Sequence, residues 1–293
     1  MKKPLAENDT LGNAAAHFFK SGNVTRSDAN DALGRVTALI PKEGNHGTRL
    51  EYDLWYDIKD KNAIHGYVYT DMLTSMVYMK PASAARAYQI MRTSTLEPIT
   101  EEGEMLFKDI GTNNNDKYNL KKARKSYKFV IFLAGTNCIN DVMDFDKIEN
   151  AVKQGAYLKC HPLTSIGLVT NLKNRFGADK IIDKKVSGHQ LLEEAAIVGC
   201  AENSEMGLVA LAKGKTVYMF DKAKRSRSWT YTPIYRAISE DGRLNPSKFK
   251  SILSSRYSGL IPSQVDDPEN RIELFFTYFK GVPHVKPRNS GDK

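Results

Sequence analysis

The chain has 293 residues, of which 41% are hydrophobic, so it is long enough to bury a large core and to form two domains. Its formal net charge is +9, and most of the basic excess belongs to the C-terminal half, which favours a polyanionic partner. No apolar run approaches the roughly 20 residues of a membrane-spanning helix, and the polar N-terminus lacks the apolar region of a signal peptide. We therefore expect a cytoplasmic protein without a membrane span. Its three cysteines have no C-x-x-C spacing and should be buried, reduced thiols.

The N-terminal half has few regular patterns. Residues 36–40 predict a strand, and a turn-forming loop at 41–48 follows it. Residues 67–69 predict a second strand, which ends just before Asp71. The polar stretch 109–125 is the best candidate for a linker between two domains.

The C-terminal half alternates short apolar runs with helical patterns. Five runs have the length and composition of buried strands, and a helical pattern lies between each consecutive pair. This alternation predicts a parallel, doubly wound sheet with helices on both faces. The predicted strands are residues 128–133, 156–160, 180–183, 196–200 and 216–220.

Polar motifs follow three of these predicted strands. The carboxyl ends of parallel strands lie at one edge of the sheet, where helix N-termini direct backbone N–H groups and partial positive charge at anionic ligands. Several such motifs in one half of the chain predict a diphosphate or nucleotide site. Its expected residues are Gly135, Thr136, His161, Pro162, Asn203, Ser204 and Glu205.

Each motif also has a purely structural interpretation. In this interpretation, His161 does no more than begin a helix after the sharp turn that Pro162 makes. Ser204 and Glu205 do no more than cap a helix, which is worth up to about 1 kcal/mol for each residue without any ligand.

Other nucleotide-binding motifs are missing. The segment 134–137 does not provide the G-x-G-x-x-G of a dinucleotide-binding turn, and Gly214-Lys215-Thr216 lacks the upstream glycine of a P-loop and precedes a strand. Asp144 and Asp146 fit a D-x-D pattern but are better placed to cap the following helix. We therefore expect no metal requirement.

Two basic clusters flank the predicted sheet, and the second lies beside two aromatic residues. Basic side chains interleaved with aromatic ones suit a nucleic-acid backbone or another polyanion. The alternative is a solvated linker and a solvated loop. The clusters are Lys121, Lys122, Arg124 and Lys125 before the first strand, and Lys222, Lys224, Arg225 and Arg227 after the fifth.

Residues 128–221 resemble the nucleotide-sugar domain of GT-B glycosyltransferases, most of all that of bacterial capsule enzymes such as Kdo transferases and polysialyltransferases. The resemblance lies in His161-Pro162, in the segment 203–211, and in the Gly214-Lys215-Thr216-Val217 that follows. It implies a nucleotide-sugar co-substrate, UDP- or CMP-linked, whose phosphates contact His161 and Ser204. Glu205 matches an acidic position of the same motif.

The resemblance implies an α/β protein of GT-B-like architecture, with two Rossmann-like domains and a cleft between them. We expect residues 1–127 to form the acceptor side and residues 128–240 the donor domain. In residues 241–293 a helix near 269–280 would return to the N-terminal domain. An inverting transfer needs a base, which Asp71, Glu43 or His46 would supply from the N-terminal domain.

The expected function is transfer of a sugar from a nucleotide sugar to a hydroxyl acceptor, best matched by hydroxymethylated pyrimidines in phage DNA, in the cytoplasm of the host. Capsule or another surface polysaccharide is the alternative acceptor. An alternative from another class is a non-enzymatic nucleic-acid-binding module, although that function would not explain why the polar motifs gather at strand ends.

Overall fold

The computed structural model describes part of the chain. The described residues are 52–56, 64–72, 76–112, 121–123, 125–136, 138–162, 164–223, 228–262 and 268–281. Two of the expected base residues and four of the expected basic residues lie outside them, namely Glu43, His46, Arg124, Lys224, Arg225 and Arg227.

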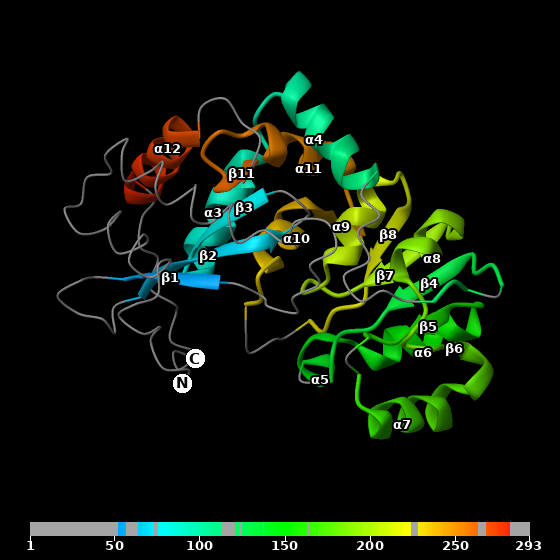
Figure 1. The fold of residues 1–293 in the computed structure, drawn as a ribbon. Coiled ribbons are helices and arrows are strands. Elements are labelled where there is room, and N and C mark those ends of the chain that lie inside the picture. Colours follow the sequence, from blue (N-terminus) through cyan, green and yellow to red (C-terminus); the bar gives the residue numbers. More distant parts are fainter. Residues whose placement is uncertain are drawn as a thin grey trace. The chain divides into compact units, whose positions relative to one another are not determined.

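Two compact units make up the chain (Figure 1). The first comprises residues 1–103 and 251–293, and the second comprises residues 104–250. The sequence placed its boundaries near residues 127 and 240 instead. The donor and acceptor roles that it gave to the two parts of the chain stay predictions.

The first unit contains a four-stranded antiparallel sheet. Its order is β1 (Tyr52–Tyr56), β2 (Ile64–Met72), β3 (Met76–Pro81) and β11 (Leu260–Pro262). The connection from β2 to β3 is far shorter than the dozen or more residues of a parallel crossover, so these two strands must pair antiparallel. A second Rossmann-like domain, whose sheet would be parallel, was therefore a wrong expectation for the described residues of this unit.

Helices complete the described part of this unit. They are α3 (Ala84–Ser94), the start of α4 (Glu101–Thr112) and α12 (Pro268–Gly281). Ser83 caps α3 by accepting the backbone N–H of Arg86. On α12, Arg271 is buried and pairs with Glu102.

The second unit is built on the parallel sheet that the sequence predicted. The strands are β4 (Phe129–Phe132), β5 (Tyr157–Lys159), β6 (Ile181–Ile182), β7 (Ile197–Cys200) and β8 (Thr216–Met219), followed by β9 (Ser239–Glu240) and β10 (Arg243–Leu244). The spatial order is β6-β5-β4-β7-β8-β10-β9. The strands β4 to β8 pair in parallel, and β10 and β9 add an antiparallel edge.

The order of β4 to β8 is 3-2-1-4-5, so the direction of strand addition reverses at β4. In open sheets of this kind, ligands bind outside the carboxyl ends of the strands at the point of reversal. The loops that follow β4, β5 and β7 meet at this point.

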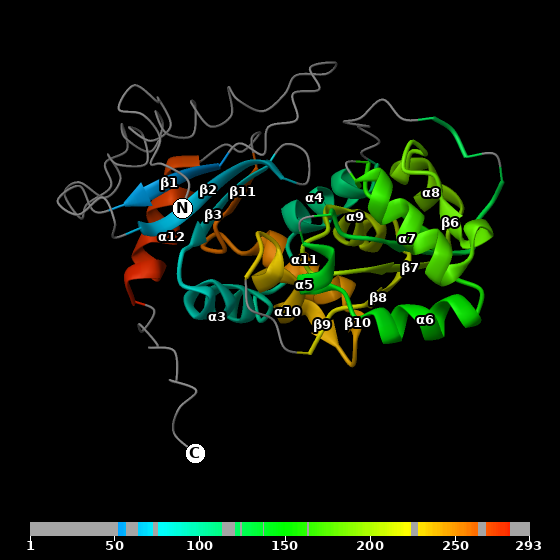
Figure 2. The same cartoon turned by 90° about the horizontal axis from the view of Figure 1, so that it is seen from below.

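Helices cover both faces of this sheet. Figure 1 shows α6 (Phe145–Lys153) and α7 (Ile166–Phe176) on one side, and α8 (Gly188–Glu194) and α9 (Glu205–Ala212) on the other. Figure 2 shows the same unit from a second direction. The remaining helices are α5 (Ile139–Val142), the short 3-10 helix η1 (Ala178–Lys180), α10 (Thr232–Ile238) and α11 (Pro246–Ser254).

The core of the second unit lies between the strands and these helices. Val130, Ile131, Leu158, Val198 and Val217 are completely buried, as continuous apolar runs in a covered parallel sheet should be. All three cysteines are buried and free, as the sequence predicted.

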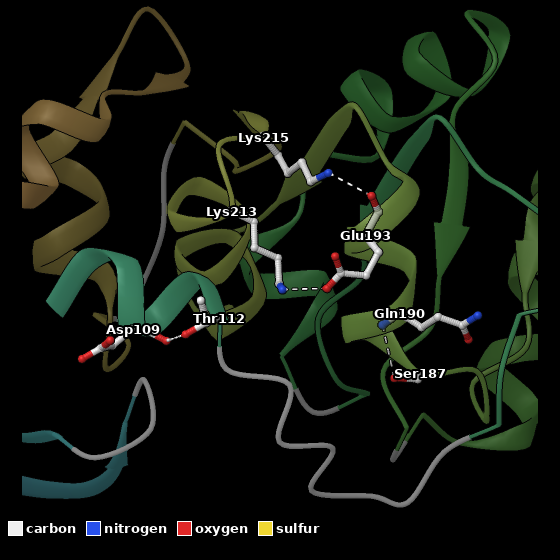
Figure 3. A network of polar contacts seen from close by, with 7 residues as sticks. All are labelled: Asp109, Thr112, Ser187, Gln190, Glu193, Lys213 and Lys215. Atoms are coloured by element: carbon white, nitrogen blue, oxygen red, sulfur yellow. Dashed lines mark hydrogen bonds and ion pairs between the residues drawn. The ribbon is translucent and has the colours of Figure 1, made fainter. Parts of the chain in front are cut away.

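Polar contacts join the helices at the edge of this core. Lys213, just after α9, pairs with the carboxylate of Glu193 on α8 at 2.7 Å, and Lys215 donates to the backbone carbonyl of Glu193 (Figure 3). No described helix is both long and apolar enough to cross a bilayer.

Candidate functional site

Three loops converge at the carboxyl edge of the parallel sheet. Thr136, after β4, accepts the backbone N–H of Ser165 at 2.9 Å, which ties its loop to the one after β5. The side-chain amide of Asn203, after β7, donates to the sulfur of Cys138 at 3.3 Å. The loop after β4 is thus bound to both of its neighbours at the point where the strand order reverses. The predicted residues Thr136 and Asn203 belong to one connected edge.

The N-terminus of α9 differs from those of α6, α7 and α8, and it shares the lack of a side-chain cap with the short helices α5 and α10. Ser204 is its N-cap residue and has extended backbone angles, but its hydroxyl makes no capping hydrogen bond. By contrast, Ser165 caps α7, Ser187 caps α8 and Asp144 caps α6 with their side chains. The first N–H groups of α9 therefore lack a side-chain cap, and they carry the partial positive charge of a helix N-terminus.

A buried acceptor precedes this helix. The Oδ1 atom of Asn203 is buried and has no hydrogen-bond partner among the described residues. A buried carbonyl without a partner costs about 1 to 3 kcal/mol, so a ligand N–H or O–H group at this place would be favoured.

Packing from α10 fixes the start of α9. The hydroxyl of Tyr235 donates to the backbone carbonyl of Ser204 at 2.5 Å. Burial raises the pKa of the Tyr235 phenol and of the Cys200 thiol beside it, so both stay protonated. Gly207 faces these two groups, and a Cβ at Gly207 would overlap both. The absence of a side chain at Gly207 thus lets α9 lie close to β7 and α10.

Two buried acidic side chains, those of Glu202 and Asp221, lie next to the Asn203-Ser204 segment. Glu202 is 1% exposed and accepts hydrogen bonds from Thr232 at 2.9 Å and Arg236 at 3.3 Å. Its backbone N–H donates to Asp221 at 2.9 Å. Burial raises the pKa of Asp221 to about 7, against the opposing effect of Lys147 and Arg236. Sequence reasoning missed both acids, although Asp221 directly follows the predicted strand 216–220 and Glu202 comes two residues after the end of the predicted strand 196–200.

The His161-Pro162 motif forms a turn at the end of β5. The backbone N–H of Thr164 donates to the carbonyl of His161 at 2.9 Å. Burial, and to a lesser extent the charge of Lys159, lowers the pKa of His161, so its imidazole is neutral at neutral pH. A neutral imidazole can donate one hydrogen bond to a phosphate oxygen but supplies no charge. Thr164 is 1% exposed, and its hydroxyl has no partner among the described residues.

The first basic cluster divides between the two edges of the sheet. Lys121 pairs through its backbone with residues 185 and 187, beyond the carboxyl end of β6. Lys125 instead lies over the ring of Tyr157, at the amino end of β5, at 4.9 Å. Lys122 is exposed next to Lys121. In the second cluster, Lys222 follows β8 and donates from its side chain to the carbonyl of Asn140.

Nothing in the described part of the structure brings the expected base residues together with these groups. Asp71 lies near the end of β2 in the first unit, and the other two are outside the described residues.

The remaining predicted donor-site residues lie at the starts of helices or in turns. The carbonyl of Gly135 accepts the N–H groups of Cys138 and Ile139 and thereby starts α5. Pro162 is half-buried, and Glu205 lies in the first turn of α9. In the described part of the chain no group of three or more His, Cys, Asp or Glu could hold a metal ion.

No protein-family model matches the chain, and no curated protein matches it. Among solved structures, the chain is similar to KpsC of Thermosulfurimonas dismutans, a beta Kdo 2,7 transferase, with a TM-score of 0.38 and 12% sequence identity. The match covers 71% of this chain and 74% of that chain.

Proposed function

We propose that this protein is a glycosyltransferase that moves a sugar from a nucleotide-sugar donor to a hydroxyl group of an acceptor. One observation carries the proposal, namely the start of α9 at the reversal point of a 3-2-1-4-5 sheet. There the hydroxyl of Ser204 does not cap its own helix, and the adjacent Asn203 presents a buried acceptor without a described partner. Such a helix N-terminus suits a phosphate, and the sheet edge is where nucleotides bind in this class of fold.

The site would act on the leaving group. When the bond between the sugar and the phosphate breaks, negative charge develops on a phosphate oxygen, and hydrogen-bond donors placed beforehand at that oxygen lower the barrier. The first N–H groups of α9, the Ser204 hydroxyl and the neutral imidazole of His161 are such donors. We assign the Asn203 acceptor and Glu205 to N–H or hydroxyl groups of the donor, because neither favours a phosphate oxygen.

The acceptor hydroxyl must lose a proton if the reaction inverts the sugar configuration. Asp71, Glu43 and His46 remain our candidates for that base because carboxylate and imidazole side chains are the usual general bases of enzymes. The metal-independent character of the reaction is likewise part of the proposal.

For the acceptor we propose a polyanionic polymer. The formal net charge of +9 supports this. Lys125 lies at the edge of the sheet opposite the donor site, at the amino end of β5, so it does not add to the support. A surface polysaccharide and duplex DNA with hydroxymethylated pyrimidines are the two acceptors to compare.

Nucleotide binding tests the donor half of the proposal. We expect a nucleoside diphosphate or CMP to raise the melting temperature, because a ligand that binds only the folded protein stabilises it. Mass spectrometry with a panel of nucleotide sugars should then reveal slow hydrolysis of one of them. Stabilisation by DNA or RNA, with none by any nucleotide, would instead favour a non-enzymatic nucleic-acid-binding module.

Transfer to two acceptors tests the other half. The protein is incubated with the hydrolysed nucleotide sugar and either hydroxymethylcytosine-containing duplex DNA or an acidic polysaccharide. A mass increase on the base assigns DNA as the acceptor, and a mass increase on the polysaccharide alone excludes it. Salt dependence does not separate the two, because both polymers are polyanions.

A further inference from the structure

Four lysines lie in two segments that pair through their backbones beyond the carboxyl ends of β5 and β6, and one of these segments contacts the buried Lys159. We call Lys121, Lys122, Lys184 and Lys185 the lysine corner. The backbone N–H of Lys121 donates to the carbonyl of Lys185 at 2.7 Å. The ammonium of the buried Lys159 donates to the carbonyl of Lys184 at 3.2 Å. The corner thus combines two segments that are more than 60 residues apart in the sequence.

The four lysines of the corner lack the carboxylate partners that five other lysines of this unit have. Within the described part of the chain, none of its four ammonium groups forms an ion pair with Asp or Glu. The neighbouring Asp183 accepts the backbone N–H of Lys185 instead. Elsewhere in the unit the pairs are Lys147 with Asp144, Lys153 with Glu149, Lys213 with Glu193 (Figure 3), Lys248 with Glu240 and Lys250 with Glu104.

Hydrogen bonds connect the corner to the His161 turn. The ammonium of Lys184 donates to the carbonyl of Thr164 at 2.8 Å, and that of Lys159 donates to the carbonyl of Cys160 at 2.7 Å. Cys160 and Thr164 bracket His161 and Pro162. Positive charge that forms no ion pair with a described carboxylate therefore lies next to the turn that carries the proposed phosphate contact, although the carboxylate of Asp183 is in the same segment.

The charge of the leaving group decides which donor fits this arrangement. A nucleoside diphosphate leaves with about one phosphate group more of negative charge than CMP does, and the extra charge needs cations close by. The neutral His161 supplies none, and a helix N-terminus supplies the equivalent of roughly half a charge. Lysine ammonium groups are point charges that suit a phosphate group.

We propose that the lysine corner binds the second phosphate of the donor, so that the donor is a nucleoside diphosphate sugar and not a CMP-linked one. The inference rests on the proposed function. In the transfer, the bond between the anomeric carbon and the phosphate oxygen breaks, and its electron pair stays on that oxygen. The acceptor oxygen bonds to the anomeric carbon, and its proton passes to the base.

Matched pairs of nucleotides test the inference. The dissociation constants of CDP and CMP, and of UDP and UMP, are measured by calorimetry at one salt concentration. Loss of contact with one phosphate removes at least one charge-assisted hydrogen bond, so we expect the diphosphate of the preferred base to bind about tenfold more tightly than its monophosphate.

The variant Lys122→Gln/Lys185→Gln keeps the bond from Lys184 to Thr164, so it should reduce that ratio to about threefold or less and leave the affinity for the monophosphate unchanged. The control Lys153→Gln/Lys248→Gln removes the same net charge from lysines that already have carboxylate partners, and it should keep the ratio. Circular dichroism checks that both variants are folded.

Three outcomes would overturn the inference. The first is that CMP binds as tightly as any diphosphate, and the second is that the corner variant weakens binding of the diphosphate and the monophosphate equally. If the corner variant leaves all nucleotide affinities unchanged but reduces binding of an anionic polymer, the corner belongs to the acceptor. The proposed function itself fails in a different way, namely if no nucleotide binds the unmodified protein.

Discussion

The backbone N–H of Glu202 donates a hydrogen bond to the carboxylate of Asp221, and both side chains are buried at the ends of neighbouring parallel strands. The Glu202 carboxylate also accepts hydrogen bonds from Thr232 and Arg236, which both belong to α10. The segment Asn203-Ser204, our candidate phosphate site, is therefore fixed by contacts of two buried acids that lie next to it. One of these acids, Asp221, titrates near neutral pH.

Titration of Asp221 predicts a loss of stability as the pH rises. Its pKa is about 7 in the folded protein and 3.8 as an ordinary aspartate, so between these values the folded state binds a proton that the unfolded state lacks. The free energy of unfolding should therefore fall with increasing pH across this window, by up to about 1.4 kcal/mol per pH unit, with no further loss from this group at higher pH.

The variant Asp221→Asn isolates this effect, because Asn keeps an oxygen that can accept the Glu202 N–H but cannot titrate. Urea unfolding at several pH values between the two pKa values of 3.8 and about 7 should show a flatter profile for the variant than for the original protein. Parallel profiles would mean that Asp221 titrates normally.

The uncapped Ser204 separates a ligand role from a structural one. Because its hydroxyl makes no capping bond, Ser204→Ala should change the free energy of unfolding by less than about 0.5 kcal/mol. Ser165→Ala and Ser187→Ala should each cost about 1 kcal/mol, because both hydroxyls accept a helix N–H. In nucleotide titrations, Ser204→Ala should weaken binding by about 1 to 3 kcal/mol.

His161→Ala should weaken nucleotide binding in the same way. If both variants bind nucleotides as the original protein does, the phosphate assignment is wrong. If Ser204→Ala is instead as destabilising as Ser165→Ala, the hydroxyl serves the helix.

The parallel sheet could be predicted because its information is local. Each strand is a short apolar run, and each helix between strands has an apolar stripe and a recognisable start such as Ser187. Alternation of strands and helices then leaves few topologies. The convergence of the loops that carry Thr136, His161 and Asn203 follows from that topology. The position of the candidate site at this edge of the sheet could therefore be predicted from the sequence alone.

The remaining features depend on contacts between distant residues. The bond from Lys184 to Thr164 joins two loops, and no periodicity in the sequence signals it. Lys121 to Lys125 read as one basic cluster because they are close in sequence, yet the chain carries them from one edge of the sheet to the other. In the first unit, the pairing of β11 with β3 could not be predicted because β11 comes from residues 260–262, far in sequence from the strand it extends.

Packing of α9 predicts that Gly207 tolerates no side chain. An alanine Cβ would overlap the sulfur of Cys200 and the hydroxyl of Tyr235, so Gly207→Ala should lower the free energy of unfolding by about 1 to 3 kcal/mol. It should also displace the helix start and reduce nucleotide affinity.

Gly167→Ala is the matched control, since a Cβ there meets nothing within 4 Å and Gly167 lies in helix α7. Alanine is the better helix former, so this change should stabilise the protein by up to about 1 kcal/mol. Equal effects of the two substitutions would contradict the packing argument.

Loss of the catalytic base should abolish turnover and spare donor binding. Proton transfer contributes only in the transition state, so the base variant among Asp71→Asn, Glu43→Gln and His46→Gln should reduce kcat by about 10² to 10⁴-fold with an unchanged nucleotide dissociation constant. Asp53→Asn is a control for the change of charge, because Asp53 lies on strand β1 and has no proposed role. Rates are measured with the acceptor that the transfer experiment identifies.

A variant that loses nucleotide binding together with turnover is not a base variant. If all three keep near-normal rates, either the base lies elsewhere or the sugar configuration is retained, and the stereochemistry of the product then decides between these two.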